Sequence, residues 1–462
     1  MKPLTNNTPL THISKISIKK LFGYYSYSFP GAGSLSELVI VYADNGAGKT
    51  TLLRLIFQIL STSRSQGHKT SLAETSFSEL EIGLSNGRTI IAKRANGLLT
   101  GPVTFEILSP KELVAKWDFD PARDESNVTT EHNIERKTWD RLPAGIRKQL
   151  ILAMGKQKFF EELDQLNVSC FILTPDRILL GGEQQQKQND QYMRSRSDSL
   201  SDLLLQSRSN SLARAIVDAS DLVRKKVFRG TYNSGNSANQ IYDTVLSQIL
   251  DNKPVGETGL TPAKLKESLR KKLNLLNEDY AKFSNYGLAA KIETDELMAS
   301  IDKAKGAKVP LVHSIIEPYI NSLQARAQSL QEVYGIVDSF VRNVNVFLKD
   351  KQLQFKAASG FSIRSTLSPQ GLEVSQLSSG EQQLLLMFFH VLAARDTSSI
   401  FIIDEPEISL NIKWQRILVA SLLEVARESG IQLIFSSHSF EILAKHRDSV
   451  ISLQDLSFKP VS

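Results

Sequence analysis

The sequence is short of cysteine and of long apolar runs. Its 462 residues include one cysteine, Cys170, which excludes an internal disulfide and suits a reducing cytosol. We expect this cysteine to be a small buried hydrophobe rather than a nucleophile. No stretch approaches the roughly 20 apolar residues that span a bilayer, and the polar N-terminus lacks the apolar segment of a signal peptide. We therefore expect a cytoplasmic protein that does not enter a membrane.

Neither the charged residues nor the residues that could bind a metal form a dense cluster in the sequence. The net charge of +6 permits contact with nucleic acid, but only a clustered basic face would indicate it. Two short basic groups occur in helical stretches, and we expect both on exposed faces: Arg224, Lys225, Lys226, Arg270, Lys271 and Lys272. Solvated helix surface is one interpretation, and contact with nucleic acid or an acidic partner is the other.

Residues 43–55, ADNGAGKTTLLRL, nearly match the phosphate-binding pattern G-x-x-x-x-G-K-[ST]. The apolar run 37–42 before them predicts a buried strand, and the apolar spacing after them predicts a helix. Backbone N–H groups beside glycines at the start of a helix suit phosphate oxygens. Lys49 would reach the β- and γ-phosphates, and the Thr50 hydroxyl would ligate Mg²⁺. The expected ATP-binding residues of this loop are Asn45, Gly46, Ala47, Gly48, Lys49, Thr50 and Thr51.

Ala43 stands where the pattern has its first glycine. The alanine is harmless if its φ angle is negative, whereas a left-handed backbone would cost about 1–2 kcal/mol. In either case we expect the loop to bind a nucleotide. A chance glycine-rich turn is the alternative, and the rest of the chain argues against it.

Three further motifs follow in the second half of the chain. They are a serine- and glycine-rich turn before a helix (QLSSGEQQLLLMFF, 376–389), an apolar strand that ends in two acids (SIFIIDEPEISL, 399–410), and an apolar strand followed by a histidine (IQLIFSSHSFEIL, 431–443). Each has an ordinary interpretation: a capped helix, a helix-capping acid, and a polar residue at a sheet edge. Their order behind a phosphate loop argues against chance assembly.

Together these motifs resemble those of ABC-type ATPases, with residues 13–118 similar to the first part of the ATPase head and residues 355–455 to the second. The resemblance implies an α/β fold: an ABC-type P-loop ATPase head, a mixed sheet with helices, that carries a long inserted helical or coiled-coil arm. The implied domains are the N-terminal part of the head (1–118), the arm with a short head strand near 169–176 (119–354), and the C-terminal part of the head (355–462).

The resemblance also implies a role for each motif. Thr50 and Asp404 would hold Mg²⁺, the cofactor of the bound ATP. Glu405 would be the general base that orients the attacking water, and His438 the switch histidine near the γ-phosphate. A signature turn would close on the ATP of a second subunit, so that ATP joins two heads and hydrolysis releases them. The signature residues are Ser378, Ser379 and Gly380.

Two positions depart from the family pattern. Asn411 falls where many members carry Asp in the loop after the acidic strand, which puts a cross-subunit role there in doubt. No glutamine can be assigned to the Q-loop, and residues 173–177, LTPDR, are its nearest counterpart by similarity to RecF-like heads.

The inserted arm carries the longest periodic signal. Apolar residues alternate at spacings of four and three from Ile316 to Leu348, which predicts a heptad seam. We expect an antiparallel helix hairpin within one subunit, and pairing with a second subunit is the alternative. Upstream, residues 261–283 predict a helix with Thr261 as its N-cap. Residues 181–211 predict an exposed loop leading into a helix.

The long insertion and the lack of a membrane segment place the chain beside the SMC, RecF and OLD-like ATPases. The resemblance is nearest to the ATPase subunits of two-component anti-phage systems, such as AriA of PARIS and PtuA of Septu. It implies an ATP-hydrolysing sensor that forms a homodimer or larger homo-oligomer and holds or releases a separate TOPRIM or HNH nuclease effector. Nucleic acid and a phage trigger protein are further candidate partners. The alternatives are a RecF/SMC-like DNA-repair ATPase and a nucleotide-binding scaffold without turnover.

Overall fold

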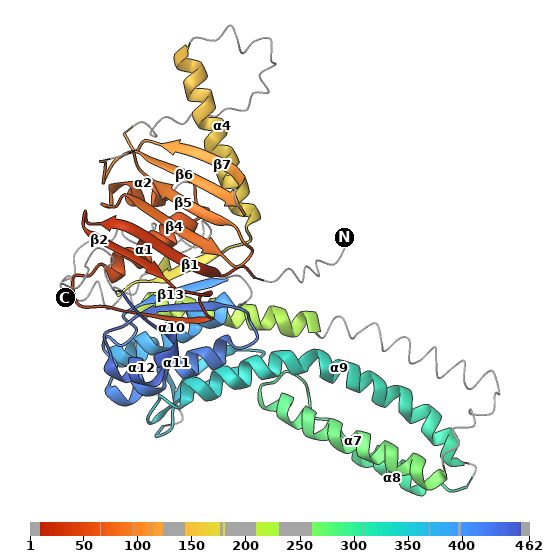
Figure 1. Ribbon diagram of the computed structural model, residues 1–462. Helices are drawn as coiled ribbons and strands as arrows, with labels where there is room; N and C mark the ends of the chain where they lie inside the picture. Colours follow the sequence, from red (N-terminus) through yellow and green to blue (C-terminus); the bar gives the residue numbers. More distant parts are fainter. Residues whose placement is uncertain are drawn as a thin grey trace, which may run out of the picture. The chain divides into compact units, whose positions relative to one another are not determined.

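The computed structural model describes residues 10–64, 66–95, 97–110, 112–122, 144–175, 179–180, 209–230, 261–306, 308–368, 370–395 and 399–453 (Figure 1). The chain divides into two compact units. The first unit comprises Met1–Leu203 and Ala394–Ser462, and the second comprises Leu204–Ala393.

An antiparallel sheet forms one layer of the first unit. Its strands lie in the order β2-β1-β4-β5-β6-β7. A turn at residues 85–88 joins β4 to β5, and Gly87 adopts a φ of 80° there. Helix α4 (Ala144–Gln165) packs along β6 and β7 (Figure 1). The strand bounds are β1 Ile13–Leu21, β2 Tyr25–Phe29, β4 Glu79–Leu84, β5 Thr89–Lys93, β6 Val103–Ser109 and β7 Glu112–Phe119.

The second layer of this unit is a mostly parallel sheet in the order β15-β3-β14-β13-β8-β9. Its central strands are buried along nearly their whole length, which explains why they read as continuous apolar runs in the sequence. Cys170 is the first residue of β8 and is buried, as expected, and burial raises the pKa of its thiol. The strand bounds are β3 Leu38–Tyr42, β8 Cys170–Leu173, β9 Leu179–Leu180, β13 Ile400–Asp404, β14 Gln432–Ser436 and β15 Val450–Ser452.

Helix α1 (Lys49–Leu60) joins the two sheets into one core. Its buried apolar side chains belong to a single cluster with residues of both sheets. Hydrogen bonds from one side chain add to this contact. The side chain belongs to Gln432, which is fully buried on β14. Its side chain accepts from the Ile13 N–H at 2.8 Å and donates to the carbonyls of Ile13 and Ser36, each at 2.9 Å. One side chain therefore satisfies backbone groups at the start of β1 and just before β3.

The second unit is mainly helical and carries one small sheet. A cluster of phenylalanines holds it together, and the ring of Phe340 lies 5.1 Å from that of Phe361 and 5.0 Å from that of Phe389. The elements are a helix over residues 209–230, α7 Pro262–Asn285, α8 Asp295–Lys303, α9 Lys308–Asn345, β10 Lys351–Lys356, β11 Gly360–Ser365, β12 Gly371–Leu372, the 3-10 helix η1 Val374–Gln376, and α10 Ser379–Ala394.

Helices α7 and α9 pack side by side along the arm (Figure 1). The Lys272 ammonium pairs with Glu317 at 2.8 Å, and the Tyr286 hydroxyl, just beyond α7, donates to Asp338 at 2.9 Å. Contacts therefore advance in the same direction along both helices, so the two helices are parallel. The expected pairing within one chain is confirmed. The expected antiparallel direction is wrong for α7, whereas the helix over residues 209–230 does run antiparallel to α9, since Lys226 pairs with Glu332 and Gly230 lies against the Ser329 carbonyl.

The parallel arrangement requires the chain to return between the two helices. Residues 289–293 lie beside both of them, next to Tyr280 of α7 and Tyr319 of α9, and α8 follows. Most residues of the predicted seam are buried, which confirms the periodicity, although α9 ends at Asn345, before Leu348. The fully or largely buried seam residues are Ile316, Ile320, Ala327, Leu330, Val337, Val341 and Val344.

The six basic residues expected on exposed faces divide into two groups. Lys225, Arg270 and Lys271 are exposed. The other three are half-buried, so the expectation is wrong for them, and each of them pairs with a carboxylate. Those pairs are Arg224 with Asp221, Lys226 with Glu332, and Lys272 with Glu317.

The expected fold class is confirmed: the chain is α/β, with sheets and helices around a P-loop and a long helical arm. The expected loop at 181–211 lies outside the described residues as far as residue 208. Among the helices that the structure describes, none is both long and apolar enough to cross a membrane.

Candidate nucleotide site

Three neighbouring parallel strands of the first unit end at the same edge of their sheet. Val41 of β3, Ser436 of β14 and Asp404 of β13 are paired in register. The phosphate loop follows β3, the acidic pair begins at the end of β13, and the histidine loop follows β14. The carboxyl edge of a parallel sheet is where α/β proteins bind ligands. The structure thus gathers three of the four predicted motifs at one place.

The phosphate loop has the backbone that its sequence predicts. Gly46 and Gly48 have φ angles of 85° and 84°, whereas Ala43 is not among the residues with positive φ. The alanine is therefore not strained at this position. A Cβ atom on Gly48 would lie 2.8 Å from Cδ2 of Leu21, so the loop and β1 approach each other closely. The Tyr27 hydroxyl donates to the carbonyl of Ala47 at 2.9 Å and anchors the loop from β2.

Helix α1 begins at Lys49, directly behind the glycines. Gly48 is its N-cap and offers no side chain to the first-turn N–H groups, and the first turn holds no acidic residue. Its first N–H groups and its dipole thus suit an anion. Asn45 and Gly46 are exposed, while Ala47, Thr50 and Thr51 are half-buried along the same segment.

Lys49 spans the loop from inside. Its side chain is buried, and its ammonium donates to the carbonyls of Ala43 at 2.8 Å and Asp44 at 3.2 Å. Burial lowers the pKa of Lys49 below its ordinary value, and nearby carboxylates, first Glu405 and then Asp404, oppose this shift. The lysine and the acidic pair therefore act on one another within one site.

Asp404 has the features of a magnesium ligand. It is 1% exposed, and its Oδ1 accepts a hydrogen bond from the Ser436 hydroxyl. Its Oδ2 is buried and has no hydrogen-bond partner. Buried carboxylate oxygens are normally paired, and Mg²⁺ binds oxygen donors of this kind, often through water. The residues present therefore fit the ion, with the hydroxyl of Thr50, at the start of α1, as a second oxygen donor.

Glu405 follows Asp404 in a left-handed turn. Its φ is 51°, a conformation that is uncommon outside glycine and is found often at functional sites. Its N–H is directed at both oxygens of Ser436, at 3.2 Å to the carbonyl and 3.1 Å to the hydroxyl. The turn is thus held by the neighbouring strand and leaves the Glu405 side chain half-buried.

His438 is exposed, and its backbone is held by a residue to which the sequence analysis gave no role. That residue is Glu407, which accepts from the His438 N–H at 2.6 Å. The only sequence signal for it is a second glutamate two positions after the acidic pair in DEPE. Motif comparison stops at the acidic pair and does not identify it.

The signature turn belongs to the second unit. Both the N–H and the hydroxyl of Ser378 donate to the Glu381 carboxylate, at 2.7 and 2.8 Å, and the Glu381 N–H donates back to that hydroxyl at 3.3 Å. This is capping-box geometry at the start of α10. Burial raises the pKa of Glu381, but hydrogen bonds from Lys351 and Ser378 outweigh it and hold the pKa below its ordinary value. Ser378 and Ser379 are exposed while Gly380 is buried, and their contact with a nucleotide stays a prediction.

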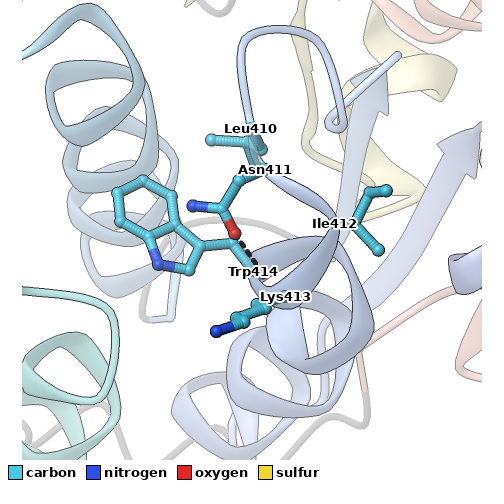
Figure 2. A pocket seen from close by; sticks show the side chains of 5 residues that line it. All are labelled: Leu410, Asn411, Ile412, Lys413 and Trp414. Carbon is cyan, nitrogen blue, oxygen red and sulfur yellow. Dashed lines mark hydrogen bonds between the residues drawn. The ribbon is translucent and has the colours of Figure 1, made fainter.

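Asn411 has a local structural role. It is the N-cap of α11 (Ile412–Ala426), and its side-chain oxygen accepts from the Trp414 N–H at 3.0 Å (Figure 2). Leu410 to Trp414 line an open hollow around this cap. Asp caps helices as well as Asn does, so the departure from the family pattern leaves the helix start intact. Of the Q-loop candidate, Thr174 and Pro175 follow β8, and residues 176–177 lie outside the described residues.

Comparison with solved structures finds Smc heads at low identity. One is the Smc head domain of Pyrococcus furiosus with an extended coiled coil, bound to the C-terminal domain of ScpA (13% identity, TM-score 0.36, 96% of this chain and 94% of that chain). Another is the Smc head domain of Pyrococcus yayanosii with a coiled coil and joint (13%, 0.36, 96% and 95%). A third is an Smc head bound to the C-winged helix domain of ScpA (9%, 0.35, 94% and 92%).

Comparison with protein families gives a match over most of the chain. Residues 33–443 match the AAA ATPase domain, a span that begins before β3 and ends beyond His438. Among curated proteins no relative is detected. The matched span contains all four motifs, and the chain belongs to the AAA ATPase domain family.

Proposed function

We propose that this chain binds ATP together with Mg²⁺ and hydrolyses it. One observation carries the proposal: at the carboxyl edge of three parallel strands, a buried lysine from the phosphate loop lies close to an acidic pair whose first member, Asp404, keeps one buried oxygen unpartnered. A cation supplies a partner for that oxygen, and a phosphate chain supplies an anionic partner for the lysine, whose ammonium here donates to the carbonyls of Ala43 and Asp44.

Each residue has a separate task in this proposal. Lys49 and the first N–H groups of α1 bind the phosphates and orient them, and Asp404 with Thr50 holds the cation. Mg²⁺, when bound, neutralises charge that develops on the phosphate oxygens. In this proposal Glu405 accepts a proton from the attacking water, and the exposed His438 contacts the γ-phosphate.

The decisive experiment compares Glu405→Gln with the wild type in steady-state phosphate release. The variant keeps the cation ligand and the lysine but loses the base, so turnover should fall by about 10²-fold or more while ATP affinity is retained. Lys49→Ala should instead lose ATP binding in calorimetry. Glu424→Gln, an exposed carboxylate on α11, is the matched control and should behave as wild type. Wild-type turnover in Glu405→Gln would contradict the assignment.

We extend the proposal to an oligomeric sensor whose output is made by a separate protein. The support is the resemblance of motif order and inserted arm to the ATPase subunits of two-component defence systems, together with a surface on the arm. Along α9, Leu311, Ile315 and Tyr319 recur at a spacing of four and are 51%, 42% and 41% exposed. An exposed apolar row of this kind suits a protein partner.

Co-purification from cells that express the neighbouring genes tests this extension. A stable complex with a TOPRIM or HNH protein is expected, and the charge substitution Ile315→Glu should weaken it without changing ATP turnover. Binding of gapped DNA in an ATP-dependent manner, with no co-purifying protein, would favour the repair ATPase instead.

A further inference from the structure

Glu407 links the acidic loop to the histidine loop. One of its carboxylate oxygens, Oε1, accepts three hydrogen bonds from consecutive residues after β14. These come from the Ser437 hydroxyl at 2.9 Å, the His438 N–H at 2.6 Å and the Ser439 N–H at 3.2 Å. Hydrogen bonds to an ionised acceptor are about twice as strong as neutral ones. A single carboxylate oxygen thus contacts three consecutive residues of the histidine loop.

The residues on either side of His438 are fixed independently of its side chain. Ser437 and Ser439 are buried, and the Ser439 hydroxyl donates to Gln415 of α11 at 2.7 Å. Gln415 in turn donates to the carbonyl of Leu410 at 2.9 Å, in the same loop as Glu407. The two loops are therefore cross-linked at both ends, and the imidazole of His438 projects from a backbone that cannot easily shift.

Glu407 is also close to the phosphate loop. Burial lowers the pKa of Lys49, and the negative charges of four carboxylates raise it again. Glu407 is one of these four. Its second oxygen, Oε2, is buried without a hydrogen-bond partner. A glutamine could accept the same hydrogen bonds through its amide oxygen. Anchoring the loop therefore requires neither the negative charge of Glu407 nor its unpaired oxygen.

We propose that Glu407 is a positioning residue for ATP hydrolysis, which holds His438 in a fixed relation to Glu405 and Asp404. This inference rests on the proposed ATPase function. Glu407 does not touch the reacting atoms. It acts through the backbone of the histidine loop, so its loss lets His438 move away from the γ-phosphate while the phosphate loop still binds ATP.

The test uses two substitutions of the full chain, Glu407→Ala and Glu407→Gln, with Glu424→Ala as control. Glu407→Ala should lower kcat by about 10- to 100-fold, the effect of a small misplacement of a reacting group, with KM and ATP affinity changed less than about threefold. Glu407→Gln keeps a carbonyl oxygen that can accept from His438, so it should recover part of the lost kcat. The control should match the wild type.

A double-mutant cycle separates positioning from general stability. In a His438→Ala background, Glu407→Ala should cost little further activity, because residues that act through one another are not additive. Hydrogen exchange at the amides of residues 437–439 should speed up in Glu407→Ala and much less in Glu407→Gln. The exchange rates of these amides can be measured whether or not the enzyme hydrolyses ATP.

The outcomes that overturn the inference are distinct from those that overturn the ATPase function. A wild-type kcat in Glu407→Ala would refute the positioning role of Glu407 and leave the proposed ATPase function standing. So would a loss of kcat in the His438→Ala background as large as the loss that Glu407→Ala causes in the wild type. A wild-type chain that binds ATP but never releases phosphate would refute the proposed function, and unchanged exchange at residues 437–439 would then refute the anchoring as well.

Discussion

Two glycines of the phosphate loop share a left-handed backbone but differ in their surroundings. Gly46 has open space where a Cβ atom would lie, whereas a Cβ on Gly48 would meet Leu21 at 2.8 Å and Phe22 at 3.0 Å. Residue-scale reasoning from φ alone would treat both positions alike. The neighbouring strand distinguishes them, because close packing leaves no room for one additional carbon.

Gly48→Ala should therefore damage nucleotide binding more than Gly46→Ala. The backbone conformation costs about 1–2 kcal/mol in both variants, but only Gly48→Ala also forces the side chains of Leu21 and Phe22 to move away from the loop. We expect a loss of ATP affinity of at least about tenfold in Gly48→Ala and a smaller one in Gly46→Ala, measured with a fluorescent ATP analogue. Equal losses would show that the contact with Leu21 is unimportant.

Lys69 is a charged residue in the core of the first unit. It lies in α2 (His68–Glu74), and its ammonium donates to the carbonyls of Gln58 and Ile59, at 2.7 and 2.8 Å, at the end of α1. Three aromatic rings surround it, and burial lowers its pKa to about 7. The carbonyls and rings favour the charged form, and burial outweighs them. The rings belong to Phe105, Phe159 and Phe160.

The free energy of unfolding should therefore depend on pH through Lys69. The folded pKa of about 7 lies below the ordinary value of 10.5, so between these values the unfolded chain binds more protons. Stability is lowest below pH 7 and rises with pH through this window, by up to about 1.4 kcal/mol per pH unit. Lys69→Met should remove this slope in thermal unfolding at pH 7 and pH 9, and exposed Lys158→Met should not. A constant difference between wild type and Lys69→Met at both pH values would contradict the assignment.

At the scale of elements, contacts between side chains of the arm determine the partner and the direction of α9, which the sequence periodicity does not specify. A heptad seam predicts that α9 has a buried face but does not specify its partner or its direction. The pairing of Lys272 with Glu317, and of Tyr286 with Asp338, specifies both. Two parallel helices need a connecting segment that brings the chain back from the end of the first helix to the start of the second. Residues 289–293 and α8 form this segment, whereas a helix hairpin has only a short turn between its helices.

Cross-linking distinguishes the parallel from the antiparallel arrangement. In the double variant Lys272→Cys/Glu317→Cys, a short bismaleimide should join the two cysteines within one chain, because the native side chains lie 2.8 Å apart. The native Cys170 is buried and should not react. Lys272→Cys/Arg342→Cys, which would link only if the helices were antiparallel, is the control. Cross-links that form between chains, or in the control pair alone, would overturn the parallel arrangement.

At the scale of the whole molecule, the nucleotide motifs are divided between the two units. Lys49, Asp404, Glu405 and His438 lie in the first unit, whereas the signature turn at Ser378 lies in the second. Ser378 and Ser379 of the turn are exposed, and Glu381 holds the turn in shape through its hydrogen bonds with Ser378. This division suits the proposed arrangement, in which the turn serves the ATP of another copy of the chain.

ATP should therefore control self-association. Glu405→Gln with ATP and Mg²⁺ should sediment as a dimer or larger species, because the closed state is not released by hydrolysis, and should be smaller without nucleotide. Adding Ser378→Trp should prevent association, whereas Ser362→Trp, on an exposed position of β11, should not. Association that is the same with and without ATP, or unaffected by Ser378→Trp, would count against the head-to-head assembly.

Much of the nucleotide site could be anticipated from local patterns. Strand, glycine-rich loop and helix around Lys49 are dictated by short-range chemistry, since buried strands are apolar and phosphate loops need glycines where φ is positive. The pair Asp404–Glu405 and His438 were identified in the same way. The domain boundaries and the site roles stay predictions, because a fold does not by itself reveal which ligand binds.

The sequence by itself determined the local elements of this protein: the strands, the phosphate loop, the capped start of α10 and the buried seam of α9. These depend on neighbours close along the chain. Only the tertiary structure decided the direction of α7 against α9, the difference between Gly46 and Gly48, and the link from Glu407 to His438. Each of these depends on residues that are far apart in the sequence and meet only when the strands are paired and the helices packed, and no local pattern encodes such a meeting.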